Sequence, residues 1–387
     1  MDFTVPEHIV LLRESLRRFI DKEMPRRAAA SWDEENHFPR EVFDRLVEMG
    51  LMGLCVPEEY GGTGQGTFAV MVAIEELARR SMAVAIPYIM SSCYAGMSLA
   101  ECGSEAQKRT LLPRVAADGL MFAYGWSEAD VGADVASVKT RAERDGDEVV
   151  VNGAKRFCSG PELCDYIYTL VRSGPAEARR QNLSFILIPP DTPGVRIERM
   201  NSLGIKGVPT TDVILTDVRV PAANIMGGEA GWNRGWDMIT GAGLDIEKLE
   251  VAALALGIAD AATEDAWEYS LQRQQFGRPI SGFQSIRHKL ADMRTQVHAA
   301  RLVLYHAAWA VDQGGHRGLE TSMAKLFVTE AAKAVVLEAQ TIAGAYGYVR
   351  DFDFERYVRD ALLMPIIGGS SAIQRNNIAR WSGLQRT

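Results

Sequence analysis

Three groups of residues in this 387-residue chain have types and spacings that could do chemistry. Glu247 is a carboxylate that would become basic enough to remove a proton if it lay in an apolar pocket. The hydroxyls of Ser127 and Ser159 could bind the polar rim of a planar molecule while the Phe157 ring stacks on its face. Arg273 has the planar fork of donors that pairs with phosphate oxygens.

Each of these residues also has an ordinary explanation when it is taken alone. Ser127 and Ser159 could cap turns, and Phe157 could fill a core. Arg273 near a helix end is more often a solvated charge, and Glu247 could be a surface carboxylate of an amphipathic helix. Only the combination of these residues in one chain favours a common site.

The elements that must position these residues follow the order helices, sheet, helices. Helical periodicity from residue 1 to 119 predicts an N-terminal helical domain. Short β-rich runs separated by Gly, Pro, Asp and Asn predict a middle β-domain of antiparallel character over 120–231. Helical periodicity returns over 232–387, with long segments at Leu244–Arg273, Gly282–Asp312 and Gly318–Ala343 whose lengths suit a helix bundle. The predicted fold class is therefore mainly α with a middle β-domain.

A glycine-rich stretch, GGTGQG at Gly61–Gly66, superficially resembles a nucleotide-binding loop. Its glycines do not fit GxGxxG, and no strand-to-helix context surrounds it. We expect a loop with no phosphate role.

Composition excludes several classes of protein. A net charge of -8 with no cluster of Lys and Arg argues against nucleic-acid binding. The five cysteines are scattered without the spacing of zinc sites, so no metal site is expected and a reducing cytoplasmic setting fits. No signal peptide and no membrane-spanning run of about 20 apolar residues is evident. These features predict a soluble protein.

The segment from Met121 to Gly160 closely resembles the signature of the acyl-CoA dehydrogenase family. Ser127 and Glu128 take the places of the Thr and Glu in its Thr-Glu-Pro turn, and Phe157 and Ser159 those of its downstream Trp and Thr. The resemblance implies bound FAD. The residues it assigns to the flavin are Tyr124, Ser127, Phe157 and Ser159. Ala133 replaces a Ser that in relatives can touch the thioester ligand, which leaves substrate contact at position 133 open.

A second match is the RQQFG string followed by FQ, which resembles the clamp that holds the diphosphate and adenosine of FAD in this family. The residues concerned are Arg273, Gln275, Phe276 and Gln284. Gln340 and Gly344 occupy the places of a family Gln and Gly on the adenosine side. In relatives these residues reach FAD across a subunit interface.

The catalytic base of many family members is a Glu near the C-terminus, and Gly368 stands in its place here. A branch that includes the isovaleryl-CoA and long-chain enzymes carries the Glu on the helix before the clamp instead, where this chain has Glu247. The resemblance also implies that the Gly368 backbone amide polarises the thioester carbonyl, and that the missing side chain leaves room for Glu247 or a branched acyl group. Asp245 and Lys248 match positions that contact the CoA moiety.

The resemblance spans nearly the whole chain. It implies a three-domain fold, with a β-barrel-like middle domain and a C-terminal four-helix bundle, and a homotetramer. The implied reaction is α,β-desaturation of an acyl-CoA, with Glu247 taking the α-proton, the β-hydride passing to flavin N5, and electrons leaving to an electron-transfer flavoprotein. The base position and Gly368 favour a branched, cyclic or bulky acyl group, and Ala85 stands where a glutaryl-type enzyme has an Arg.

Two alternatives remain open from the sequence. One is a related flavoenzyme, either an enoyl-CoA reductase of the crotonobetainyl-CoA type, which also pairs a Gly with a helix Glu, or a desulfinase. The other is a non-catalytic subunit that supplies part of a flavin site to an active partner.

Overall fold

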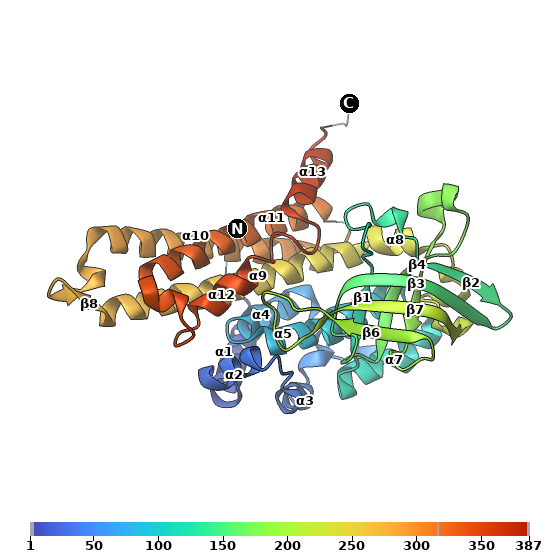
Figure 1. Ribbon diagram of the computed structural model, residues 1–387, viewed down its shortest axis with the longest axis horizontal. Coiled ribbons are helices and arrows are strands. Elements are labelled where there is room, and N and C mark those ends of the chain that lie inside the picture. Colours follow the sequence, from blue (N-terminus) through green and yellow to red (C-terminus); the bar gives the residue numbers. More distant parts are fainter. Residues whose placement is uncertain (1–3, 316, 385–387) are drawn as a thin grey trace.

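The computed structural model describes residues 4–315 and 317–384, and in them the chain folds as helices, then a curled sheet, then helices (Figure 1). The predicted fold class is confirmed. The element type changes close to the expected boundaries, because α7 ends at Asp118, β1 begins at Phe122 and α8 begins at Gly235.

The N-terminal domain is built from short helices whose starts are encoded locally. Pro6, Pro25 and Pro39 each immediately precede a helix, where the fixed φ of proline suits the first turn. A capping box between Ser104 and Gln107 begins the last helix of the domain. The helices are α1 (Glu7–Glu23), α2 (Arg26–Glu34), α3 (Arg40–Glu48), α4 (Gly66–Ala78), α5 (Met82–Ile89), α6 (Ser98–Cys102) and α7 (Glu105–Asp118).

One long apolar helix, Met82–Cys102, runs through this domain and consists of α5, a π-helical segment η3 (Met90–Met97) and α6. By length and composition it could cross a membrane, which corrects the expectation that no such run exists. However, 89% of its apolar window is buried inside the protein. The π-helical segment lies just beyond Pro87, and π-helical turns of this kind often mark functional sites.

The middle domain is a seven-stranded sheet with the order β1-β4-β2-β3-β7-β6, and β5 pairs with β4. Most pairs are antiparallel, as expected, but β1 pairs with β4 in parallel. A register shift between Lys155 and Cys158 interrupts the pairing of β3 with β7. The strands are β1 (Phe122–Gly125), β2 (Arg141–Asp145), β3 (Glu148–Ser159), β4 (Tyr166–Arg172), β5 (Leu183–Ile188), β6 (Val195–Arg199) and β7 (Thr210–Pro221).

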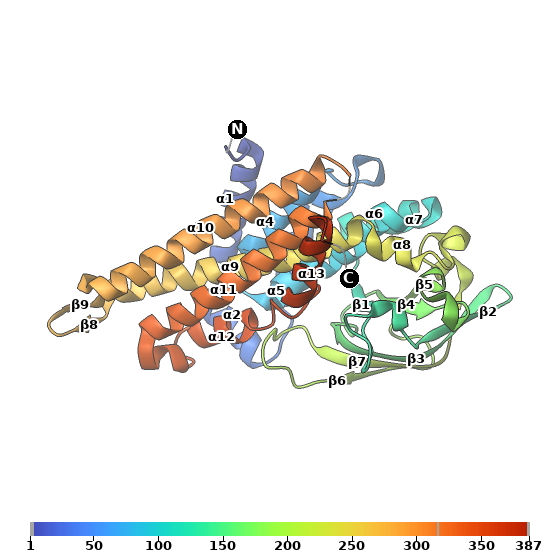
Figure 2. The same cartoon turned by 90° about the horizontal axis from the view of Figure 1, so that it is seen from above.

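Three long helices dominate the C-terminal domain, and the short α12 and α13 pack on α11. The bounds of the three long helices agree with the predicted segments to within two residues. A small hairpin of β8 and β9 joins α9 to α10 and forms the tip of the domain farthest from the sheet (Figures 1 and 2). The elements are α8 (Gly235–Thr240), α9 (Ala242–Gln272), β8 (Gln274–Gln275), β9 (Arg278–Pro279), α10 (Gln284–Asp312), α11 (Gly318–Ala343), α12 (Phe354–Ala361) and α13 (Ser371–Trp381).

Helix α9 is the centre of the molecule. It contacts α4, α10, α11 and η3, so residues from Lys248 to Ala262 are buried on all sides of the helix. Most of them are Ala, Leu, Val, Ile or Gly, as close packing of a helix on several neighbours requires. The ionisable residues within this stretch are therefore exceptional.

The glycine-rich stretch at residues 61–66 is a loop that leads into α4. The N-terminal amides of that helix already have an acceptor, because Thr67 and Phe68 donate to the Asp312 carboxylate at 2.7 and 2.9 Å. A Cβ on Gly66 would lie 2.9 Å from the same carboxylate. The helix end that could have held a phosphate is thus capped by the protein itself.

Candidate active site

Glu247 lies on the first turns of α9, the part of the helix nearest the sheet (Figure 2). Its side chain is half-buried, and desolvation raises the pKa of its carboxyl to about 7, although the charges of Lys248 and Lys325 act in the opposite direction. A carboxylate with this pKa changes its charge near neutral pH, as a general base should.

Lys325 approaches Glu247 from α11. It is fully buried, and its ammonium has no hydrogen-bond partner in residues 4–315 and 317–384. Burial lowers the pKa of Lys325 to about 8, while Glu247 opposes that shift. A desolvated cation beside Glu247 favours the ionised form of the base.

Gly368 lies against the same turn of α9. Its φ is +60°, and a Cβ built on it would lie 2.9 Å from Val251 Cγ2 and 3.4 Å from the Glu247 carbonyl oxygen. The space beside Gly368 is therefore occupied by Val251, which corrects the expectation that the missing side chain leaves room for Glu247 or an acyl branch. Gln374 Nε2 donates to the Gly368 carbonyl at 3.0 Å. In the described parts of the chain no carbonyl accepts from the Gly368 N–H, which could therefore polarise a thioester.

Asp245 and Lys248 were expected to contact CoA, but the structure buries both at 1% and 2% exposure. Lys248 donates to Asp245 at 3.0 Å, and Thr321 of α11 donates to the same carboxylate at 2.7 Å. The two residues therefore join the start of α9 to α11. They position Glu247 and have no surface to offer to CoA.

The residues predicted to bind flavin come together at β1 and β3. Ser127 and Phe157 are held side by side, because Arg156 N–H donates to the Ser127 carbonyl at 2.9 Å. Glu128 fixes this turn by accepting from Lys139 N, Thr140 N and the buried Lys155 ammonium.

Phe157 shows that a planar group fits here. It lies within the register shift of β3 with φ +62°, and its side chain is 61% exposed. A non-glycine residue in this left-handed conformation is uncommon, and a bulge re-aims its side chain out of the sheet. The ring is thus exposed beside the half-buried Ser159, and the Arg156 guanidinium lies over one of its faces at 5.3 Å from the centroid, which leaves the other face for a ligand. These residues fit the isoalloxazine of FAD.

Tyr124 connects the flavin residues with α9. Its ring stacks on Tyr94 of η3 at 3.7 Å between centroids and on Trp126 at 4.6 Å. Burial raises the pKa of Tyr124 well above its usual value, and the charges of Glu250 and Glu247 add to this. Trp126 also packs near Phe185, so its ring belongs to the aromatic cluster behind Tyr124.

Sequence reasoning missed Tyr94, Glu250 and Lys325. Glu250 is 2% exposed and follows Glu247 by three residues on α9, so both project from the same face. The available signal was an acidic residue in the otherwise apolar run LEVAALALGIA. Ala133, in contrast, lies exposed on the loop after β1, and its contact with substrate remains a prediction.

The predicted diphosphate clamp gathers at the opposite end of α9. Arg273, Gln275, Phe276 and Gln284 are exposed at the β8–β9 hairpin, with Phe276 93% exposed. Gln340 and Gly344 lie at the same end, where Gln340 donates to Gly347 and Arg273 lies over the Tyr346 ring at 5.5 Å. About 40 Å of helix separates Glu247 from Arg273 at 1.5 Å per residue. One chain therefore does not bring its clamp to its own base.

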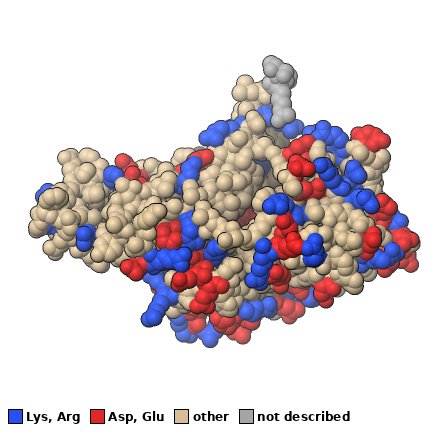
Figure 3. Space-filling view, in the orientation of Figure 1, with Lys and Arg blue, Asp and Glu red and all other residues tan. Residues whose placement is uncertain are grey.

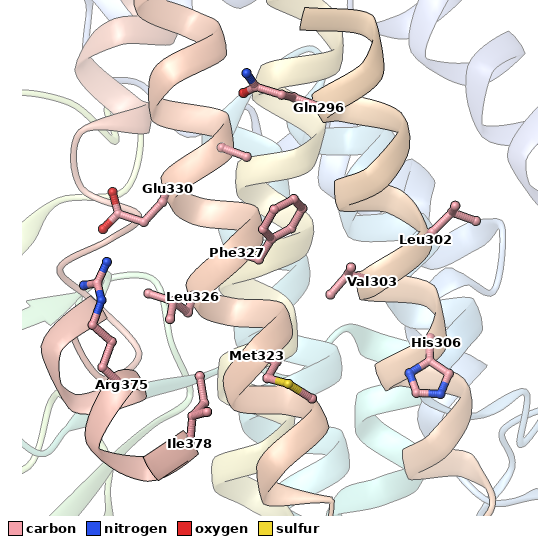
Figure 4. Close-up of a pocket in the computed structure, with 11 residues that line it drawn as sticks. Gln296, Leu302, Val303, His306, Met323, Leu326, Phe327, Glu330, Arg375 and Ile378 are labelled. Atoms are coloured by element: carbon pink, nitrogen blue, oxygen red, sulfur yellow. The ribbon is translucent and has the colours of Figure 1, made fainter. Parts of the chain in front are cut away.

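An open groove lies elsewhere, between α10, α11 and α13, and has a volume of about 770 Å³ (Figure 4). Its lining is mainly apolar, and Glu330 and Arg375 lie on one side of it. Met323 and Phe327 belong to this outer face of α11, whereas Lys325 faces inward. The groove is separate from the Glu247 site.

The helix–sheet–helix fold, the carboxylate of raised pKa and the exposed residues at β1 and β3 are features of a flavin-dependent oxidoreductase. The chain belongs to the acyl-CoA dehydrogenase family. The N-terminal, middle and C-terminal domains of that family match residues 6–118, 123–218 and 233–383. Members of the family are FAD-dependent oxidoreductases.

Relatives in the family act in both directions. The chain is 35% identical over 381 residues to cyclohexane-1-carbonyl-CoA dehydrogenase of Geobacter metallireducens, covering 98% of each protein. It is 35% identical over 383 residues to acryloyl-CoA reductase (NADH) of Anaerotignum propionicum, covering 98% of this chain and 95% of that protein. The structure of glutaryl-CoA dehydrogenase with glutaryl-CoA is 33% identical, with a TM-score of 0.93 over 100% of this chain and 98% of that one.

Proposed function

We propose that this protein catalyses α,β-desaturation of an acyl-CoA thioester with Glu247 as the base that takes the α-proton. The observation that carries the proposal is a carboxylate with a pKa of about 7 on the helix that faces the flavin residues. Bound FAD would supply the acceptor for the β-hydride. The Gly368 N–H would donate to the thioester oxygen as negative charge develops there.

The chain's own groups also set the protonation of the site. Lys248 and Lys325 favour the ionised form of Glu247 before the reaction, and burial favours the protonated form after it. The closely packed Tyr94, Tyr124 and Trp126 exclude water from the side opposite α11.

The acyl group is proposed to be branched, cyclic or otherwise bulky. The helix position of the base supports this, as does a relative that acts on cyclohexane-1-carbonyl-CoA. Ala85 is buried in α5, and no Arg stands at its position to pair with a terminal carboxylate. Faster turnover of short straight-chain thioesters than of branched ones would contradict this part of the proposal.

A homotetramer is proposed as the assembly. The distance between the proposed clamp and the base supports a second chain that completes each FAD site, and the clamp end carries exposed apolar side chains with few charges (Figure 3). These include Leu271, Phe276, Tyr348 and Phe352. The apolar groove between α10, α11 and α13 offers a further surface for a second copy. The proposed electron acceptor is an electron-transfer flavoprotein, as the family resemblance implies.

The test is the absorbance of the purified protein during anaerobic titration with a panel of acyl-CoAs. We expect a yellow flavin spectrum that one thioester bleaches in the wild type but not in Glu247→Gln. Glu268→Gln is the matched control, because Glu268 is exposed on the same helix and should leave bleaching unchanged. Bleaching that persists in Glu247→Gln would reject this base, and a colourless protein would favour the partner-subunit alternative.

A second candidate function is enoyl-CoA reduction, because one relative is an acryloyl-CoA reductase. It uses the same residues in reverse, with Glu247 returning the proton. Dithionite-reduced protein would then be reoxidised by an enoyl-CoA faster than oxidised protein is bleached by the corresponding acyl-CoA. The opposite order would support the dehydrogenase.

A further inference from the structure

Glu250 is a second carboxylate in the active site that the desaturation reaction does not use. It is 2% exposed, and its Oε2 has no hydrogen-bond partner in the described residues. Leaving a buried acceptor without a partner is unfavourable, so such a group in a native site calls for an explanation.

The neighbours of Glu250 lie on η3 and β1, between Glu247 and the flavin residues. It lies one helical turn beyond Glu247, about 4.5 Å farther along the axis of α9. Cys93 and Tyr94 of η3 interact with its carboxyl, and its charge acts on the Tyr124 hydroxyl. Tyr124 leads to the flavin residues along β1, so Glu250 faces the same space as the base but deeper in the protein.

We propose that the unpartnered oxygen of Glu250 binds a hydroxyl or ammonium group carried by the substrate's acyl chain. This inference rests on the proposed function, since it places the α-carbon of the thioester at Glu247. Because Glu250 follows Glu247 by one helical turn, the polar group is proposed to lie a few bonds beyond the α-carbon, on or next to the γ-carbon.

The rest of the pocket suits such a group. The stacked Tyr94 and Tyr124 rings supply aromatic faces, which attract cations and accept the apolar part of the chain. Burial, together with the charge of Glu247, raises the pKa of Glu250 well above its usual value. A hydroxyl substrate can therefore bond to the neutral acid, whereas an ammonium substrate would ionise it.

The test compares three thioesters that differ only in their last group: pentanoyl-CoA, 4-hydroxybutanoyl-CoA and 4-aminobutanoyl-CoA. Their affinities for the dithionite-reduced holoenzyme, which cannot accept a hydride from the thioester, are measured by anaerobic calorimetry in the wild type, Glu250→Gln and Glu250→Val. We expect the wild type to bind at least one polar thioester about 10-fold or more tightly than pentanoyl-CoA, and Glu250→Val to reverse the order.

Glu250→Gln separates the two polar groups, because it keeps a hydrogen-bonding amide but cannot ionise. Binding of the hydroxyl thioester should survive in this variant if a hydroxyl is the natural partner. Binding of the amino thioester should be lost if an ammonium is. Because Gln preserves shape, this comparison remains decisive even if Glu250→Val does not fold.

The inference is overturned if the wild type binds pentanoyl-CoA as tightly as both polar thioesters, or if Glu250→Val keeps the wild-type order. Binding is measured without turnover, so the proposed function is judged separately. Tight binding of a polar thioester without flavin bleaching would support the Glu250 subsite and reject dehydrogenation.

Discussion

The pH dependence of flavin reduction is the most direct check on Glu247. With the pKa of its carboxyl at about 7, kcat/KM should rise about tenfold per pH unit below pH 7 and level off above it. At pH 5 the value should be about one hundredth of the plateau. A carboxyl at its usual value of 4.5 would give an almost flat profile from pH 6 upward.

Lys325→Met tests the cause of that pKa. The Lys325 charge lowers the pKa of Glu247, so its removal should move the acid limb of the profile to higher pH. Glu268→Gln is the matched control. Glu268 is exposed on the same helix, 21 residues after the base, so this variant should leave the limb in place.

The assay is stopped-flow bleaching of the flavin under anaerobic conditions at low substrate, from pH 5 to 9. At low substrate the observed rate follows kcat/KM, whose pH dependence reports the pKa of the base in the free enzyme. The reasoning would be refuted if the midpoint of the wild-type acid limb lay below pH 5.5. It would also be refuted if the acid limb moved to lower pH in Lys325→Met. Loss of the limb together with most of the rate in Glu247→Gln is required for the assignment to hold.

Three further predictions concern stability and FAD binding. Gly368→Ala should lower the free energy of unfolding by about 1–3 kcal/mol in urea, because φ is +60° and the new Cβ meets Val251; equal stability would contradict this. Arg273→Ala should lower the FAD-to-protein absorbance ratio with unchanged circular dichroism, and full retention of FAD would reject the clamp. Glu250→Gln should raise the Tm more at pH 8 than at pH 5. The raised pKa of Glu250 keeps the folded protein protonated while the unfolded chain ionises above pH 4.5, so the wild type loses stability as pH rises. A Tm gain that becomes smaller as the pH rises would contradict this account.

Features that depend on local pattern could be predicted from the sequence. The periodicity of α9, α10 and α11 gave their ends to within two residues, because long helices carry many repeats of the same signal. Glu247 was proposed as the base through the resemblance to the family branch that carries its Glu on the helix before the RQQFG string. The parallel pairing of β1 with β4 was not predictable. Strand β1 has only four residues, and β4 begins at Tyr166, 41 residues after the end of β1 at Gly125.

Features that depend on neighbours from other elements could not be predicted. Asp245 and Lys248 are charged residues near a helix start, and only the position of α11 shows that they are buried in a pair. Lys325 lies on a third helix, 78 residues after Glu247 in numbering, and nothing near it in sequence indicates that it faces a carboxylate. Burial of charge is a tertiary property, so its functional meaning emerges only when the helices are assembled.

The two carboxylates on α9 can occupy one pocket because their surroundings separate their protonation. Two cations, Lys248 and Lys325, act on Glu247 and keep its pKa near neutrality despite burial. Among the described residues, the groups that lower the pKa of Glu250 are the uncharged Cys93 and Tyr94, so desolvation and the charge of Glu247 dominate its pKa. The base can therefore ionise while its neighbour stays neutral, which avoids two adjacent anions in a dry site. Residues one helical turn apart are thereby fitted to different tasks, proton removal by Glu247 and recognition of a polar acyl group by Glu250.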